Sequence, residues 1–369
     1  MTTGLPEPQF ISRNIDQITQ EMVEKFETDT DRTLYPAQVE RVFIDTIAYR
    51  ENLIRIGIQE AAKQNLVNYA NYPALDFLGE LVGCYRIIPQ SALTTLRFTL
   101  NSAQSFTVTI AAGTKIDTKD GKYTFETKEA LSIIAGNTTG DVIAQATEAG
   151  ENANGYIAGQ ITELVDVVAY VESVSNITTS NGGAGIEDDD SFRARIKLAP
   201  EAFNNAGSKG AYTYWSKTAH STIIDVAVNS PTPGSVDVYP LLRTGNPSEE
   251  ILDLVDEVLQ EERVRPLTDN VTVLSPESVN FTISATITLY NWVDQTSVET
   301  QVNTALTTYI NALKLSLGKD IVQSQIIDVI QSIYGVYKVD LSLPVTTEID
   351  FNEWANGTIG TLSYEVLDE

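Results

Sequence analysis

A long stripe of apolar residues near the amino terminus constrains this chain more than any other feature. From Pro36 to Tyr69, apolar side chains recur at steps of three, four and seven residues, which keeps them on one face of an α-helix. Pro36 suits the first turn, because its missing N–H has no helical partner there. At about 1.5 Å per residue such a helix would be about 50 Å long. A rod of that length needs a partner for its stripe, which favours a scaffold over an enzyme.

The stripe is predicted to join a helical bundle with neighbouring subunits. A helix with one apolar face gains most of its stability by burying that face against another element. The alternative is that the stripe packs on the chain's own domain, because residues 66–85 must pack locally. The residues expected in the bundle are Val39, Phe43, Ile47, Ile54, Ile58 and Ala62.

The chain is strongly acidic, with 50 Asp and Glu residues against 24 Lys and Arg residues and a formal net charge of −26. Binding to a phosphate backbone requires clustered basic side chains, so the charge argues against a nucleic-acid partner. The charge instead favours solubility, or it steers the chain toward a basic partner protein.

Neither a membrane segment nor a secretory signal is expected. The start, MTTGLPEPQF, lacks a basic segment followed by an apolar run, and no run of about 18 apolar residues occurs elsewhere. Cys84 is the single cysteine, so an internal disulfide cannot form. These observations predict a protein that is made in the cytosol.

A length of 369 residues predicts two or three structured units. The fold class expected is multidomain α+β. Composition divides the chain into an amino-terminal arm (1–35), the long helix and a junction (36–90), a β-rich domain (91–175), a linker with a helix (176–209), α+β modules (210–344) and an acidic aromatic tail (345–369).

Residues 91–175 are predicted to form a small antiparallel β domain. Leu96, Phe98 and Leu100 alternate with polar residues, and the apolar positions from 106 to 110 do the same. This period of two is typical of strands that are buried on one face. The glycines expected in turns between the strands are Gly113, Gly121, Gly136 and Gly140.

A linker rich in Ser, Thr, Asn and Gly precedes a helix that is predicted to begin near Asp190. Residues 187–190 place carboxylates at the positive end of this helix, and Ser191 or Asp190 can cap it. The acidic cluster therefore has a local explanation. It also lacks the alternating spacing of a calcium-binding loop.

From residue 210 onward the pattern predicts helix, strand, strand, helix, strand, helix, helix and strand. The strands are expected at 223–228, 236–242, 281–289 and 336–343, and the helices between them have apolar residues on one face. This order fits two βαβ-like halves of ferredoxin-like character. The tail that follows retains large apolar residues, so it is expected to dock on something through Phe351, Trp354 and Tyr364.

The search for chemistry finds no assembled active site. His220 is the single histidine and is interpreted as a structural residue at a helix end. Cys84 lies in an apolar run and is interpreted as a small buried residue rather than a thiolate. We predict no catalytic, metal-binding or cofactor-binding residues, no cofactor and no small-molecule substrate.

Four features of the chain occur together in the order that one protein family keeps. In the first, Leu75, Asp76 and Gly79 fit a Leu-Asp-x-x-Gly run, and Gly83 with Arg86 fit its Gly-x-x-Arg ending. The second is a stretch of glycines and asparagines. The third is the run from Asn181 to Ile196, with its Gly-Gly, acidic, Ser and Arg-x-Arg-Ile order, and the fourth is the order of elements from 207 to 344. The residues of the second stretch are Gly150, Asn152, Asn154, Gly155 and Gly159.

This ordered set resembles the baseplate J-like family, the wedge proteins of contractile phage tails and related contractile injection particles. The resemblance implies a structural wedge subunit in the tail baseplate of a virion, or of a phage-tail-like particle, assembled in the bacterial cytoplasm. It implies a role in linking wedges into a ring around a hub and in relaying the trigger for sheath contraction. The partners implied are other copies of the chain, as a dimer within a wedge, and sibling wedge, hub and sheath-proximal proteins.

Two departures and two alternatives accompany this resemblance. The acidic run at 187–190 is heavier than the family's Asp-x-Glu-Ser pattern, and the arm carries no family motif. A glycan-binding or glycan-cleaving tail component is the main alternative, because a Thr- and Asn-rich β domain with Tyr and Trp is a plausible carbohydrate surface. An enzyme that uses Cys84 or His220 is a third hypothesis.

Overall fold

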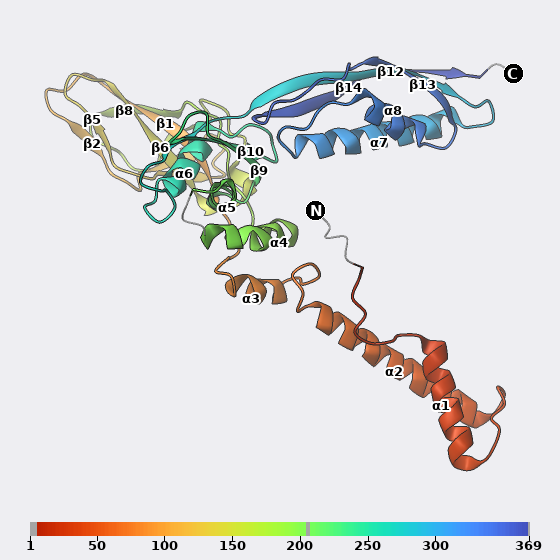
Figure 1. Ribbon diagram of the computed structural model, residues 1–369. Coiled ribbons are helices and arrows are strands. Elements are labelled where there is room, and N and C mark those ends of the chain that lie inside the picture. The colour runs from red at the N-terminus through yellow and green to blue at the C-terminus, as the bar shows by residue number, and fades with distance from the viewer. Residues whose placement is uncertain (1–5, 204–206, 368–369) are drawn as a thin grey trace. The chain divides into compact units, whose positions relative to one another are not determined.

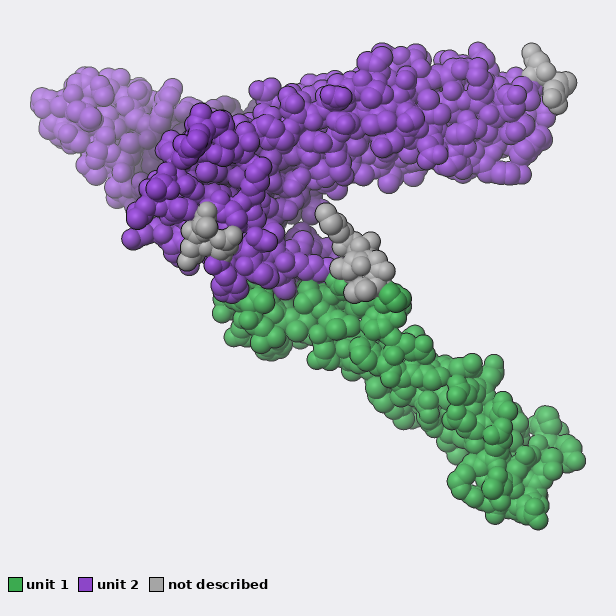
Figure 2. All heavy atoms as spheres, viewed as in Figure 1, with its two compact units in different colours: residues 1–85 green, residues 86–369 purple. Residues whose placement is uncertain are grey.

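The computed structural model describes residues 6–203 and 207–367, so small parts of the predicted arm, linker and tail lie outside the described residues. The chain forms two compact units, residues 1–85 and residues 86–369, which Figure 2 distinguishes by colour. Within the described residues, no helix is both long enough and apolar enough to cross a membrane.

Unit 1 is helical. Its helices are α1 (Ile15–Thr30), α2 (Val39–Lys63) and α3 (Ala74–Glu80), shown in red to orange in Figure 1. α1 begins at Asn14, whose side-chain oxygen accepts hydrogen bonds from the N–H groups of Asp16 and Gln17. This cap satisfies donors that have no partner within the helix.

The long helix is shorter than the sequence pattern predicts. α2 has 25 residues and ends at Lys63 rather than Tyr69, which at about 1.5 Å per residue gives a length of about 37 Å. Beyond it, the N–H groups of Asn65 and Leu66 bond to carbonyls only three residues back. The Asn65 side chain also donates to Ala61 O and Ala62 O. Asparagine competes for backbone groups in this way, which explains the stop.

Residues 6–35, predicted as an arm, fold against α2. Ile18 of α1 is 2% exposed and packs with the inner face of α2, where Ile44 and Ala48 are buried. The segment before α1 is held by Gln59, which accepts a hydrogen bond from Phe10 N at 2.9 Å and donates to Pro8 O at 2.7 Å. The inner face of α2 is therefore covered by its own chain.

The first part of unit 2 is the predicted β domain, and its six-stranded sheet is antiparallel throughout. The order is β7-β3-β4-β6-β1-β8, with a separate β2-β5 pair. Asn176 links the two ends of the order, because its side-chain oxygen accepts from Gln160 N and Ile161 N at 3.0 and 2.9 Å. The strands are β1 (Ser91–Leu100), β2 (Val108–Ile110), β3 (Lys115–Thr118), β4 (Thr124–Thr127), β5 (Leu131–Ile133), β6 (Thr139–Ala149), β7 (Ile161–Leu164) and β8 (Val171–Asn176).

The core of this domain follows the alternation read from the sequence. Leu96, Phe98 and Leu100 are all buried, at 0%, 0% and 3% exposure. The turn prediction was wrong at Gly140, which lies within β6. A Cβ at Gly140 would stand 2.8 Å from Ile133 Cγ1, so close packing rather than a turn requires glycine here.

A central α+β module follows. Its three-stranded sheet has the order β11-β10-β9, and β10, α6 and β11 form a βαβ unit with parallel strands. β11 was not predicted from the sequence. The elements are α4 (Asp189–Leu198), α5 (Lys209–Ala219), β9 (Ile223–Asn229), β10 (Ser235–Leu242), α6 (Glu249–Leu259) and β11 (Asn270–Val273), with a short 3-10 turn at Ala199–Phe203. A second 3-10 turn, Glu151–Ala153, belongs to the β domain.

The last module has a sheet of order β13-β12-β14 with two helices packed on it (Figure 1). β12 is the middle strand, antiparallel to β13 and parallel to β14. Its alternating residues Phe281, Ile283 and Ile287 face the core, as the sequence predicts. The elements are β12 (Glu277–Leu289), α7 (Gln295–Lys314), α8 (Gln323–Gln331), β13 (Val336–Leu343) and β14 (Glu353–Val366).

The acidic tail is a correction to the sequence interpretation. Residues 353–366 are not a separate tail but the 14-residue strand β14, which pairs along the length of β12 from Glu277 to Leu289. The multidomain α+β class is confirmed. The two modules share with ferredoxin-like folds only the packing of helices on a small sheet. They differ in that each sheet has three strands and includes a parallel pair.

Candidate subunit interface

The outer face of α2 carries the predicted bundle residues except Ala62, which lies five helical turns beyond Ile44 and so on the buried side. Within unit 1, Val39, Phe43 and Ile54 are 63–66% exposed, Ile47 and Ile58 are 57% and 49% exposed, and Ala62 is partly buried. Sequence reasoning did not include Val42 and Leu53, which are 60% and 46% exposed on the same helix. Large apolar side chains gathered on one exposed face mark a surface for another protein.

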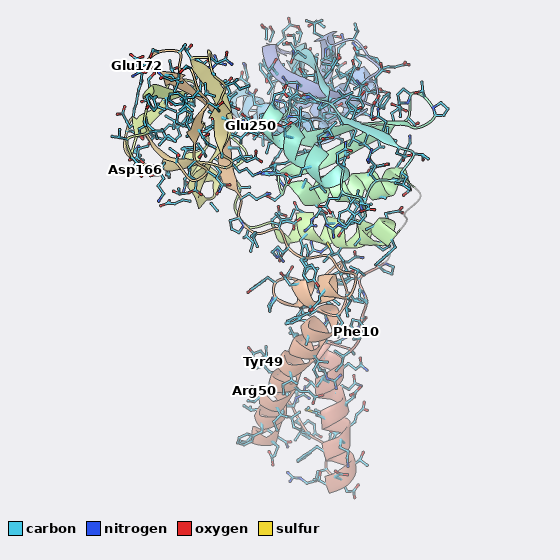
Figure 3. The ribbon with its side chains drawn as sticks, turned by 90° about the vertical axis from the view of Figure 1, so that its left-hand side faces the viewer. Phe10, Tyr49, Arg50, Asp166, Glu172 and Glu250 are labelled. Atoms are coloured by element: carbon cyan, nitrogen blue, oxygen red, sulfur yellow. The ribbon has the colours of Figure 1, made fainter. Side chains whose placement is uncertain are left out.

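This face is distinct from the face that α1 covers. Ile44, Ala48 and Gln59 follow one another at helical spacing and are all buried, whereas Phe43, Ile47 and Ile54 stand at other positions around the helix and are exposed. Figure 3 shows Arg50 on the side of α2 that faces away from α1. α2 therefore has one face buried by its own chain and another that is apolar and uncovered by any described residue of unit 1.

The residues of the junction motif from Leu75 to Gly83 pack in the interior or set the backbone conformation. Leu75 is fully buried in α3, and Gly79 is also buried. Gly83 has φ +69°, a left-handed conformation that glycine adopts without strain, and Cys84 N then bonds back to Gly79 O at 2.9 Å. Cys84 is fully buried and Asp76 is partly buried. The predicted structural interpretation of Cys84 fits this burial.

Arg86, the last residue of that motif, binds the acidic run about one hundred positions later in the chain. Its guanidinium donates to Glu187 O and Asp189 Oδ1, each at 2.7 Å, and lies 4.7 Å from the centre of the Phe192 ring. Glu187 is itself 3% exposed and accepts two hydrogen bonds from Arg195 at 2.7 and 2.6 Å. This arrangement is a charge-compensated, bidentate ion pair.

Asp188 caps α4, in place of the predicted Ser191 or Asp190. Its carboxylate accepts from Asp190 N and Ser191 N at 3.0 and 2.9 Å. Burial alone would raise the pKa of Asp188, but the hydrogen bonds donated by Ser191 and Asp190 N, together with the charge of Arg243, outweigh it and lower that pKa. Over the described residues, no group of three or more His, Cys, Asp or Glu side chains is placed to hold a metal ion.

The glycine and asparagine motif packs against the Gly-Gly motif. Asn154 donates to Gly183 O and accepts from Gly183 N, both at 2.8 Å. A Cβ at Gly183 would stand 2.3 Å from Gly150 O, so the two segments approach too closely for any larger residue. These contacts hold the β-domain loop around Gly150 and Asn154 against the segment around Gly183, which leads to α4.

The His220 side chain contacts the Gly-Gly motif as well, at Gly182 O. It is 1% exposed, and its Nε2 lies 2.7 Å from Gly182 O while its Nδ1 lies 2.7 Å from Thr222 Oγ1. A carbonyl only accepts, so Nε2 carries the proton and Nδ1 accepts from the hydroxyl. Burial lowers the pKa of His220, which favours this neutral form. The structural role predicted for His220 agrees with these contacts.

The residues predicted for tail docking contact their own chain instead. Trp354 is 7% exposed, and its Nε1 donates to Asn246 Oδ1 of the central module at 2.6 Å. Phe351 is 47% exposed and packs edge-on against Tyr239, with ring centroids 5.9 Å apart. Tyr364 is partly buried against the last core. These aromatic residues attach β14 within unit 2, where the sequence pattern indicated an external partner.

Sequence reasoning missed an exposed aromatic cluster at one end of the last module. Tyr290 stacks on Trp292 at 5.4 Å, and Tyr334 and Tyr337 each contact one of these two rings. Trp292, Tyr334 and Tyr337 are 56%, 78% and 46% exposed. The two segments are far apart in sequence and meet because Tyr290 N bonds to Gly335 O at 3.1 Å.

Three domains described for one protein family match this chain in sequence. The Baseplate J-like protein barrel domain matches residues 95–183, the Baseplate J-like central domain matches residues 204–275, and the Baseplate J-like protein C-terminal domain matches residues 281–365. The chain belongs to the baseplate J-like family. The three matches fall on the β domain, the central module and the last module of unit 2.

Two individual proteins resemble this baseplate J-like chain. Baseplate protein J of Escherichia phage P2 is 37% identical over 164 residues, which is 44% of this chain and 54% of that protein. The chain thus matches about half the length of this curated relative. A chain in the cryo-EM structure of the anti-feeding prophage baseplate aligns with 93% of this chain and 89% of its own length, at 14% identity and a TM-score of 0.39.

Parts of three of these motifs meet within unit 2. Arg86 from the first motif binds Glu187 and Asp189 of the third, and Asn154 from the second binds Gly183 of the third. We interpret these residues as holding the β domain to the central module. The exposed outer face of α2 therefore remains the candidate interface.

Proposed function

We propose that this chain is a structural component of a contractile-tail baseplate, located in the tail of a virion or of a related particle. Family membership and the resemblance to Baseplate protein J support the proposal. In the finer form of the proposal, the chain is a wedge subunit that helps close a ring around a hub and relays the trigger for sheath contraction. Its role is assembly rather than catalysis.

The observation that carries this proposal is the uncovered apolar face of α2. A free helix face with Phe43, Ile47 and Ile54 more than half exposed is costly in water unless another protein covers it. Burial of apolar surface contributes about 25 cal/mol per Å², so several such side chains supply a large driving force for association. We infer that α2 enters a helical bundle with neighbouring subunits.

The test changes two bundle residues to charged ones. Ile54→Asp with Ile58→Asp would bury two carboxylates in the bundle, so we expect assembly with the products of adjacent genes to be lost while the chain remains folded. Size-exclusion chromatography with light scattering measures the mass of the co-expressed complex. The matched control is Val167→Asp with Leu267→Asp, because these apolar side chains are 100% and 96% exposed outside α2. Normal assembly of the Ile54 and Ile58 variant would refute the bundle.

A second candidate function is glycan binding, which the aromatic cluster of Tyr290, Trp292, Tyr334 and Tyr337 favours. Exposed Trp and Tyr rings can stack on sugar rings. If the wild-type chain stays a monomer with every adjacent gene product and binds an array of bacterial surface polysaccharides, glycan binding replaces assembly as the better proposal. Binding that Trp292→Ala abolishes would locate it at the cluster.

A further inference from the structure

A cavity of about 380 Å³ lies within unit 2, between α6 and the β domain. Its volume is within the range of small-molecule sites, roughly 300 to 1,000 Å³, and such sites often lie where two domains meet. One wall comes from the β domain, from β1, β5 and β6 and from the segment between β4 and β5. The other wall is one face of α6, with Glu250, Asp253, Leu254 and Glu257 at helical spacing.

Glu250 is the buried acid of this cavity. It is 2% exposed, and Figure 3 shows it at the start of α6 on the side of the β domain. One of its carboxylate oxygens, Oε1, accepts hydrogen bonds from Thr95 Oγ1 and Thr178 Oγ1 at 2.9 and 2.8 Å. The other oxygen, Oε2, is buried and has no hydrogen-bond partner among the described residues. A buried carboxylate oxygen without a partner is costly, so it indicates a cation that would bind there.

The lining of the cavity is strongly acidic. Lys128 is the single basic residue that lines it, against five carboxylates. Of these carboxylates, only Asp141 has an ion pair within the part of the chain that the structure describes, with Arg97 at 2.6 Å. Concave surfaces of one charge raise the local concentration of ions of the opposite charge. The five acids are Glu129, Asp141, Glu250, Asp253 and Glu257.

An organic cation suits this lining better than a metal ion does. Hard metal ions require about six oxygen ligands, and the described residues contain no group of three or more His, Cys, Asp or Glu side chains that could hold a metal. Apolar side chains also separate the acids, with Leu254 on α6 and Leu131 and Val142 on the opposite wall. Methylene groups of an alkyl chain can cover these side chains while its ammonium groups meet the carboxylates.

We propose that this cavity binds an aliphatic polyamine, with one ammonium group at Glu250 Oε2 and others beside Asp253 and Glu257. Glu250 and Glu257 stand two helical turns apart, about 10 Å along α6. An extended chain with several ammonium groups can follow that distance, whereas a monoamine would neutralise Glu250 alone. A bound polyamine would contact both walls and stabilise unit 2 by mass action. This inference goes beyond the proposed function and does not depend on it.

The experiment measures spermidine binding to the full chain by isothermal titration calorimetry. Glu250→Gln keeps an oxygen that can accept from the two threonine hydroxyls but removes the charge. We expect it to weaken spermidine binding by about tenfold or more, the scale of one hydrogen bond to a charged group. Glu249→Gln is the matched control, because the neighbouring acid is exposed and does not line the cavity. Urea unfolding followed by tryptophan fluorescence checks that both variants are folded.

Two exposed positions distinguish this site from general screening of the net charge. Glu257→Gln should weaken the binding of spermidine but not that of butylamine, a monoamine. Lys128→Gln removes the single basic side chain of the lining, so spermidine should bind more tightly.

Three results would overturn the inference. The first is equal weakening by Glu249→Gln and Glu250→Gln. The second is displacement of spermidine by Mg²⁺ at an ionic strength at which NaCl leaves it bound, since a hydrated metal ion would then serve as well as the amine. The third is the absence of saturable spermidine binding by the wild-type chain. Each result leaves the proposed function untouched, because none of these measurements involves assembly.

Discussion

At the residue scale, Glu187 and Arg195 form a buried ion pair at the centre of unit 2, with an Nη2–Oε2 distance of 2.6 Å. Glu187 and Arg195 are each 3% exposed. The Arg86 side chain donates to Glu187 O, and Ile87 N donates to Glu187 Oε2. Removing one member of a buried pair leaves the other charge without compensation, which costs far more than losing an exposed pair. Loss of either side chain is therefore expected to be costly because the pair is buried.

We predict that Arg195→Met lowers the free energy of unfolding of unit 2 by about 3 to 5 kcal/mol, because Glu187 is left buried and unpaired. Arg97→Met is the control, since Arg97 and Asp141 are 47% and 40% exposed, and its effect should stay within about 1 kcal/mol. Urea unfolding followed by tryptophan fluorescence reports on unit 2, where all three tryptophans lie. Equal effects of the two variants would contradict this account.

Sequence reasoning predicted the local role of the acidic run but not the distant residues that bind it. The acidic run at the start of α4 was correctly assigned to a helix N-terminus, because capping depends on neighbours a few positions away. The pairing of Arg86 with Asp189 joins residues 103 positions apart and leaves no local pattern in the sequence.

At the scale of elements, most of the fold could be predicted from periodicity. The eight elements expected after residue 210 are present, because their apolar residues alternate or recur at helical spacing. β14 was missed because it contains Gly357 and Gly360, which are typical of loops. A Cβ at Gly357 would stand 2.5 Å from Phe281 Cζ, so the glycine makes room for an aromatic ring of the neighbouring strand. Such a requirement depends on the packed structure.

A truncation tests the reassignment of the tail to β14. Ending the chain before Glu348 removes the strand paired with β12 and the buried Trp354, so we predict that the last module unfolds or becomes susceptible to limited proteolysis. A chain that ends at Leu367 is the control and should resist protease as wild type does. If the shorter chain is as resistant as the control, residues 348–366 are a tail separate from the last module, as the sequence pattern indicated.

At the scale of the whole molecule, we propose that folding and assembly depend on different parts of the chain. Three apolar cores of the described residues lie within unit 2, with buried members from residue 92 to residue 355. Unit 1 instead exposes large apolar side chains along α2, where Ile54 is 63% exposed. A surface that remains costly in isolation and becomes favourable on contact suits a subunit that folds first and assembles afterwards.

This division predicts the behaviour of a chain that starts at Arg86. Because it keeps the three cores and the Arg86 contacts, its urea midpoint by tryptophan fluorescence should match that of the full chain. Because it lacks α2, it should not form the complex with adjacent gene products that light scattering detects for the full chain. The full-length Ile54→Asp, Ile58→Asp variant should show the same loss with both units present. If the shorter chain assembles as well as the full one, the interface lies on unit 2, and the bundle must be given up even though the family assignment stands.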